Sequence, residues 1–230
     1  MYELVIFDMA GTTVRDPGNV ADSFMHAFRE NGIDIPREEV KKVMGFRKKD
    51  AIRMLLDKYP LTTQGNTDEL IGKIHDVFIH TMISFYENDH ELSALPHAEE
   101  IFAQLNEQGI LVALNTGFTR AIADTILNRL QWNDNRNIDF VIASDEVPQG
   151  RPYPFMIQAI MKNLEITDAA RIVKIGDTEV DIAEGRNAGC GLVIGVTTGA
   201  YTRRQLEQYN PDRIIDSLEE LSTLLTVELT

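Results

Sequence analysis

The sequence predicts an α/β protein whose core is a doubly wound parallel sheet and whose inserted segment is an all-α cap domain. Along residues 93–230, short apolar runs alternate with helical patterns, which is typical of a parallel sheet covered by helices on both faces. Residues 16–92 contain helical patterns only. A block of helices that interrupts a sheet after its first strand indicates a cap over the ligand-binding edge. We therefore expect a core domain over 1–15 and 93–230 and a cap domain over 16–92.

The individual elements follow from the same patterns. The first strand is predicted at LVIF (4–7), and the four cap helices at 21–32, 36–45, 48–59 and 67–88. In the second part, strands predicted at 110–114, 140–144, 171–177 and 191–196 alternate with helices predicted at 98–109, 119–132 and 154–166. Gly109 is suited to end the first of these helices. The tail over 214–225 predicts one more short strand and an amphipathic helix.

Composition excludes several classes of partner. The net charge is −14, and a surface this acidic repels nucleic acid and anionic membranes. Cys190 is the single cysteine, so the chain cannot form an intramolecular disulfide, which suits a reducing cytoplasm. No stretch has the pattern of a signal peptide or a membrane helix. We expect a cytoplasmic protein that acts on a small molecule, and the sequence leaves open whether it forms a homodimer.

Polar residues with matching chemistry follow three of the predicted strands. Asp8 follows the first strand in DMAGTT (8–13), and Thr116 and Gly117 follow another in NTGF (115–118). Asp177 and Asp181 lie in GDTEVD (176–181). Carboxylates at strand ends suit a nucleophile or ligands of Mg²⁺, while a threonine hydroxyl and a basic residue, Arg151 in GRPYP (150–154), suit phosphoryl oxygens. Each motif alone is weak, but together they predict phosphoryl transfer to Asp8.

In these motifs the chain resembles hydrolases of the haloacid dehalogenase superfamily with a helical cap. The resemblance implies that Asp8 is the nucleophile, that Thr116 binds the phosphoryl group and that Arg151 fills the basic position. Thr12, in the turn after Asp8, is expected in the phosphate loop. The implied cofactor is Mg²⁺, with Asp8, the main-chain carbonyl of Ala10, Asp177 and Asp181 as its ligands.

Ala10 narrows the expected chemistry. Phosphatases of this superfamily place an aspartate there as general acid and base, a role that typically contributes about 10²–10⁴-fold to the rate. A carbon leaving group needs no such acid, because an imine on a lysine can take up the electrons instead. DMAGTT, GRPYP and EGRNAG (184–189) resemble the motifs of phosphonoacetaldehyde hydrolases (phosphonatases). In MGFRK (44–48), the resemblance makes Lys48 the candidate imine-forming residue, with Met44 near the reacting amine.

Two positions depart from the phosphonatase pattern. Ala51 stands where that family has a histidine, and Phe118 stands where it has a tyrosine. Three hypotheses therefore remain. The leading one is a Mg²⁺-dependent hydrolase that cleaves the C–P bond of a small phosphonate, with Gly117 and Phe118 at the substrate. The alternatives are a phosphatase for a small phosphate monoester, such as a sugar phosphate, phosphoglycolate or a nucleotide, and a non-catalytic phosphate-binding module.

Overall fold

The computed structural model describes residues 1–59 and 67–227. Within them, one sheet of six parallel strands has the order β3-β2-β1-β4-β5-β6. The strands are β1 (Leu4–Asp8), β2 (Leu111–Thr116), β3 (Phe140–Ala143), β4 (Ile172–Gly176), β5 (Leu192–Val196) and β6 (Arg213–Ile215). Chain order reverses around β1, and ligands of such sheets bind beyond the carboxyl ends of the strands at this point. The predicted fold class is confirmed.

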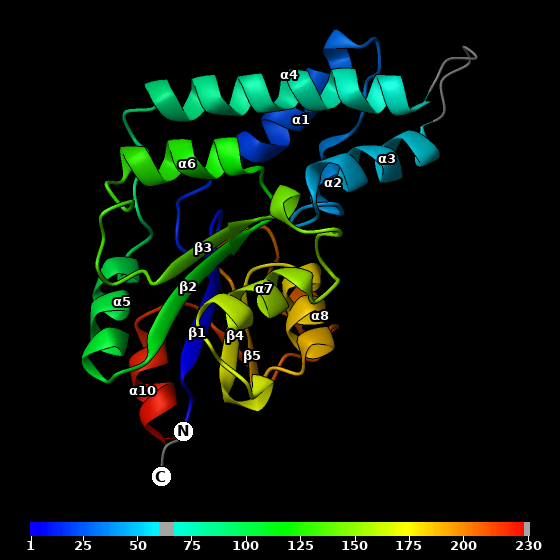
Figure 1. The fold of residues 1–230 in the computed structure, drawn as a ribbon. Helices are drawn as coiled ribbons and strands as arrows, with labels where there is room; N and C mark the ends of the chain where they lie inside the picture. The colour runs from blue at the N-terminus through cyan, green and yellow to red at the C-terminus, as the bar shows by residue number, and fades with distance from the viewer. Residues whose placement is uncertain (60–66, 228–230) are drawn as a thin grey trace.

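Side chains alternate along β1 between two apolar layers. Val5 and Phe7 belong to one buried cluster, together with residues of α5 (Ala98–Glu107) and α10 (Glu220–Val227). Leu4 and Ile6 belong to the other cluster, together with residues of α7 (Phe155–Asn163) and α8 (Glu179–Ala188). Because every second residue of a strand points to the same face, a continuous apolar run fills both layers. Figure 1 shows these helix pairs on either side of the sheet.

Four helices lie together at the end of the sheet opposite the two termini (Figure 1). They are α1 (Asn19–Glu30), α2 (Arg37–Lys41), α3 (Lys48–Lys58) and α4 (Thr67–Asn88), which we call the cap helices. α1 and α4 pack through Phe24 and Phe78, whose ring centroids are 4.5 Å apart. α4 also packs on α6 (Arg120–Arg129), which follows β2. The division of the chain into a core domain and a cap domain stays a prediction.

The chain leaves the sheet region and returns to it at one place. Val14 and Ala94 form an antiparallel bridge. The backbone N–H of Arg15 donates to the carbonyl of Ser93 (3.1 Å), and that of Leu95 donates to the carbonyl of Thr13 (2.8 Å). The two connections between the cap helices and the sheet therefore run side by side, directly after the turn that carries Asp8.

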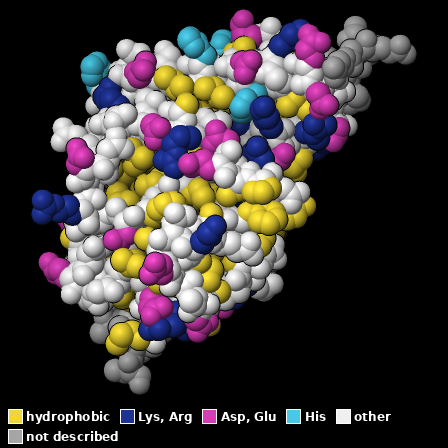
Figure 2. Space-filling model, in the orientation of Figure 1, with side chains coloured by type: hydrophobic (Ala, Val, Ile, Leu, Met, Phe, Trp, Pro, Cys, Tyr) yellow, Lys and Arg dark blue, Asp and Glu magenta, His cyan; other side chains and the backbone are white. Residues whose placement is uncertain are grey.

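The remaining α-helix, α9 (Arg203–Glu207), follows β5. Charged side chains of both signs are spread over the face drawn in Figure 2, with apolar side chains between them. None of the helices in residues 1–59 and 67–227 has the length and apolar character needed to cross a bilayer.

Candidate active site

Asp8 is the last residue of β1, and the residue is 5% exposed. The Arg151 guanidinium donates to Oδ1 of Asp8 at 2.6 Å. The other oxygen, Oδ2, accepts no hydrogen bond from the described residues, and Asp8 lines a pocket between the sheet edge and the cap helices. Burial raises the pKa of Asp8, and the charge of Arg151 opposes this shift. Arg151 thus holds one oxygen of a buried carboxyl group that lines the pocket, at the position of the predicted nucleophile.

The turn after Asp8 is closed by three backbone N–H groups, of residues 12, 13 and 14, which donate to the carbonyl of Met9. At Gly11, φ is +88°, and a Cβ there would lie 2.8 Å from Oδ2 of Asp177. Only glycine adopts this positive φ readily and leaves room for the Asp177 carboxylate. The turn brings Ala10 to the pocket. The hydroxyl of Thr12 instead lies 3.4 Å from Oδ1 of Asp177, and Thr12 is not among the pocket residues.

The two predicted metal carboxylates of GDTEVD differ in their surroundings. Asp177 lines the pocket, and its Oδ2 accepts from the backbone N–H of Ala200 at 2.6 Å. Burial, and then the negative charges of Asp8 and Asp181, raise the pKa of Asp177 well above its ordinary value. Asp181 does not line the pocket. Its Oδ1 lies 2.9 Å from Nζ of Lys174 and 3.1 Å from Nη1 of Arg151.

The pKa of Asp181 shifts in the opposite direction to that of Asp177. Burial tends to raise the pKa of Asp181, but Arg151 and Lys174 outweigh it, so the pKa is lowered. Asp181 therefore has two cations beside it within the protein, whereas Asp8 has one, Arg151, and Asp177 has none among the described residues. Asp8 and Asp177 line the same pocket, so negative charge gathers there. A divalent cation would relieve that charge, and Mg²⁺ is commonly held by one or two carboxylates with waters and substrate oxygens. Among residues 1–59 and 67–227, no three acidic, histidine or cysteine side chains form a ready-made metal site.

Arg151 lies beneath the pocket and does not line it. Besides Asp8 and Asp181, its guanidinium contacts Oε2 of Glu184 (3.0 Å) and the carbonyl of Asn115 (2.9 Å). Its side chain is fully buried. The predicted basic residue is therefore present, but Arg151 itself does not line the pocket and contacts one pocket carboxylate, Asp8, from outside it.

Two residues of this buried network, Lys174 and Asn115, were not predicted from the sequence as part of the site. Nζ of Lys174 lies 3.0 Å from Oδ1 of Asn115, which in turn contacts Glu184 through its amide nitrogen (2.9 Å). Lys174 interrupts the apolar run RIVKIGD, and a charged residue in a buried strand needs a partner. That interruption was the signal for the network.

Lys48 enters the pocket from the first turn of α3 and is 3% exposed. Nζ donates to the carbonyl of Phe46 at 3.2 Å and lies 4.9 Å from the ring centroid of Phe118. Among the described residues Lys48 forms no ion pair. Burial lowers its pKa to about 8, although the charge of Asp8 opposes the shift. The result is an amine that is partly neutral near physiological pH, in the same pocket as the candidate nucleophile.

The remaining predicted residues also meet in this pocket. Thr116, Gly117, Phe118 and Met44 line it. The hydroxyl of Thr116 accepts from the backbone N–H of Phe118 at 3.1 Å. A Cβ on Gly117 would lie 2.5 Å from the carbonyl oxygen of Gly45. The loop before α3 therefore rests directly on the loop after β2, and this contact depends on the absence of a side chain.

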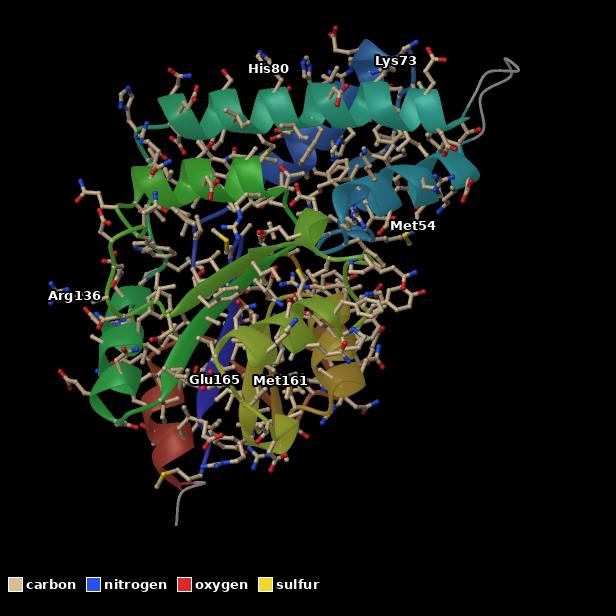
Figure 3. The ribbon with its side chains drawn as sticks, viewed as in Figure 1. Met54, Lys73, His80, Arg136, Met161 and Glu165 are labelled. Carbon is tan, nitrogen blue, oxygen red and sulfur yellow. The ribbon has the colours of Figure 1, made fainter. Side chains whose placement is uncertain are left out.

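Ala51, at the position where phosphonatases have a histidine, is buried. No histidine of the described residues lines the active-site pocket in its place. His75 on α4 lines a different pocket. Burial, followed by the charge of Lys49, lowers its pKa to about 4, so its ring is neutral. His80 is exposed and, with Lys73, lies on the outer side of α4 (Figure 3).

Comparisons with known proteins identify the family of this chain. The family model of haloacid dehalogenase-like hydrolases matches residues 5–195. A phosphonoacetaldehyde hydrolase of Bacillus cereus is 32% identical over 229 residues, which cover 94% of this chain and 85% of the relative. One of Bacillus anthracis is 31% identical with the same coverage.

Two solved structures have the same fold. A hydrolase from Pseudomonas syringae has a TM-score of 0.86 at 20% identity and covers 97% of this chain and 98% of its own. A phosphonoacetaldehyde hydrolase-like protein from Oleispira antarctica has a TM-score of 0.85 at 25% identity, with 98% and 91% covered. The chain therefore belongs to the haloacid dehalogenase-like hydrolases and, within them, is similar to phosphonoacetaldehyde hydrolase.

Proposed function

We propose that this hydrolase cleaves the C–P bond of a small phosphonate that carries a carbonyl group next to the phosphonate-bearing carbon, as in phosphonoacetaldehyde. One observation carries the proposal. Lys48 is buried without an ion-pair partner among the described residues and shares a pocket with Asp8. Imine formation requires a neutral amine, and burial without a paired carboxylate favours that form.

In the proposed reaction, the neutral amine of Lys48 adds to the substrate carbonyl and loses water, which gives an iminium ion. Asp8 then attacks phosphorus. The C–P bond breaks, and its electron pair moves toward the iminium nitrogen to give an enamine and an aspartyl phosphate. Water hydrolyses the aspartyl phosphate to phosphate. Protonation of the enamine at carbon and hydrolysis of the imine release the aldehyde and restore Lys48, so one water is consumed overall.

The other residues would support these steps. Arg151 would hold Asp8 by its Oδ1 in the direction of attack, and the hydroxyl of Thr116 would bind a phosphoryl oxygen. Asp8, Asp177 and the carbonyl of Ala10 would hold Mg²⁺, which when bound would neutralise charge on the transferring group. Ala10 fits this scheme because the departing enamine carbon needs no acid at that position.

The test is a phosphate-release screen that compares phosphonoacetaldehyde with sugar phosphates, phosphoglycolate and nucleotides. We expect phosphonoacetaldehyde to be the preferred substrate and Lys48→Met to abolish its turnover. The matched control is Lys73→Met, which removes an amine from the outer side of α4 and should have no effect. Efficient hydrolysis of phosphate monoesters that persists in Lys48→Met would reject the proposal and support a phosphatase.

A further inference from the structure

Arg151 reaches Asp8 through one of its three guanidinium nitrogens. Nη1 donates to Oδ1 of Asp8 at 2.6 Å and lies 3.1 Å from Oδ1 of Asp181. Nη2 donates to the carbonyl of Asn115 at 2.9 Å, and Nε donates to Oε2 of Glu184 at 3.0 Å. A guanidinium is a rigid plane whose donors point in fixed directions. Two nitrogens held by other partners therefore fix the direction in which the third meets Asp8.

Glu184 is the acidic partner of Arg151 that lies outside the reacting groups. It is fully buried and does not line the pocket. Its Oε2 accepts from Nε of Arg151 and also from Nδ2 of Asn115, at 2.9 Å. Its other oxygen, Oε1, is buried without a hydrogen-bond partner among the described residues, which is unfavourable. The hydrogen bonds of this carboxylate are therefore concentrated on the oxygen that holds Arg151.

The reach of Glu184 depends on how closely α8 approaches the sheet. A Cβ on the next residue, Gly185, would lie 2.9 Å from Cγ2 of Val193 and 3.0 Å from Cβ of Lys174. Glycine is unfavourable inside a helix, but here it lets the helix backbone lie directly against the side chains of β4 and β5. A larger residue would push the helix away from the sheet, and the Glu184 carboxylate would move away from Arg151 with it.

A second contact joins α8 to the segment that carries Arg151. Nδ2 of Asn187 donates to the carbonyl of Pro152 at 2.8 Å. Asn187 stands three residues after Glu184, so the two side chains are neighbours on the helix surface. α8 therefore holds this segment at two points, the guanidinium of Arg151 and the backbone directly after it. The mechanism above uses neither of these two side chains.

We propose that Glu184 is a positioning residue, which directs the guanidinium of Arg151 at Asp8 and so sets the direction in which Asp8 attacks phosphorus. Without an acceptor for Nε the guanidinium could turn, and Asp181 would compete with Asp8 for Nη1. A misplacement of about 1 Å can cost on the order of 10²-fold in rate. The inference rests on the proposed role of Asp8 as nucleophile, but it holds for a phosphonate and for a phosphate monoester alike.

The test separates the reach of the Glu184 side chain from its charge. Glu184→Asp keeps the charge, but its carboxylate is one methylene shorter and cannot meet Nε of Arg151 at the same place. Glu184→Gln loses the charge, but its amide oxygen can still accept from Arg151 and Asn115. The control is Glu207→Gln, which changes an exposed glutamate of α9. The rate of phosphate release gives kcat and KM for each variant, referred to folded protein, with the substrate that the wild-type protein prefers.

We expect Glu184→Asp to lower kcat by about tenfold or more and to change KM by less than about twofold. The effect falls on kcat because Arg151 does not line the pocket and would act through Asp8. Glu184→Gln should stay within about threefold of the wild type in both constants, because it restores the hydrogen bond without the charge. Glu207→Gln should match the wild type.

Four results would overturn the inference. An unchanged kcat in Glu184→Asp would mean that reach is unimportant, and an equal loss in Glu184→Gln would mean that charge matters instead. A loss that appears as a raised KM would place the residue in substrate binding. A Glu184→Asp protein that does not fold would mean that the residue serves the fold.

Failure of the proposed function shows elsewhere, in the wild-type protein. A wild type that prefers a phosphate monoester would reject C–P cleavage, and the comparison of the Glu184 variants would stay valid with that substrate. A wild type that turns over neither a phosphonate nor a monoester would reject both proposals.

Discussion

The ionisation of Lys48 gives the sharpest test of the proposed chemistry. Its pKa is lowered to about 8 by burial, whereas an unperturbed lysine has a pKa of ≈ 10.4. At pH 7 the neutral fraction is then ~9%, against ~0.04% for an unperturbed lysine, a gain on the order of 200-fold. From pH 6 to pH 9 the neutral fraction should rise from ~1% to ~90% and then approach a plateau.

The assay is reductive trapping of the imine with cyanoborohydride and phosphonoacetaldehyde, followed by mass spectrometry of the peptide that contains Lys48. The initial trapping rate should follow the neutral fraction, with its midpoint near pH 8. Lys48→Arg keeps a positive charge but cannot form an imine, so it should give no adduct at this position. A trapping rate that still rises tenfold per pH unit at pH 9 would refute the reasoning, as would an adduct only on exposed lysines.

Three further predictions concern the rest of the site. Gly117→Ala should lower kcat/KM on the order of 10²-fold, because its Cβ would lie 2.5 Å from a carbonyl oxygen of the loop before α3; Gly72→Ala, where a Cβ meets nothing within 4 Å, is the control and should keep full activity. Arg151→Met should lower the free energy of unfolding by about 3–5 kcal/mol in urea titrations, because it leaves buried carboxylates without their partner; a loss of activity with unchanged stability would contradict this. Removal of divalent cations with EDTA should abolish phosphate release and Mg²⁺ should restore it, because Asp8 and Asp177 share a pocket; full activity in EDTA would exclude the two-carboxylate site.

The fold could be predicted because its signals are local. Apolar runs in parallel strands are continuous and helical runs are periodic, so β1, β2 and β4 and the cap helices could be placed to within a few residues. Once the strands are parallel, their carboxyl ends share one edge, which brings Asp8, Thr116 and Asp177 to one pocket. The roles given to these residues stay predictions.

The orientation of the side chains could not be predicted in this way. Asp177 and Asp181 look equivalent in GDTEVD, yet one faces the pocket and the other faces Lys174 and Arg151. This difference depends on contacts across β4 and α8, which sequence spacing does not reveal. For the same reason the lowered pKa of Lys48 comes first from burial, which a cluster of basic residues in the sequence cannot show.

The bridge between Val14 and Ala94 has an evolutionary consequence. Since the chain departs and comes back at a single point, an entire set of helices can be exchanged by altering two junctions. The strands, their register and the buried ion network would be untouched by such an exchange. Chimeras that exchange the cap helices at these two junctions should therefore keep the sheet and its buried ion network.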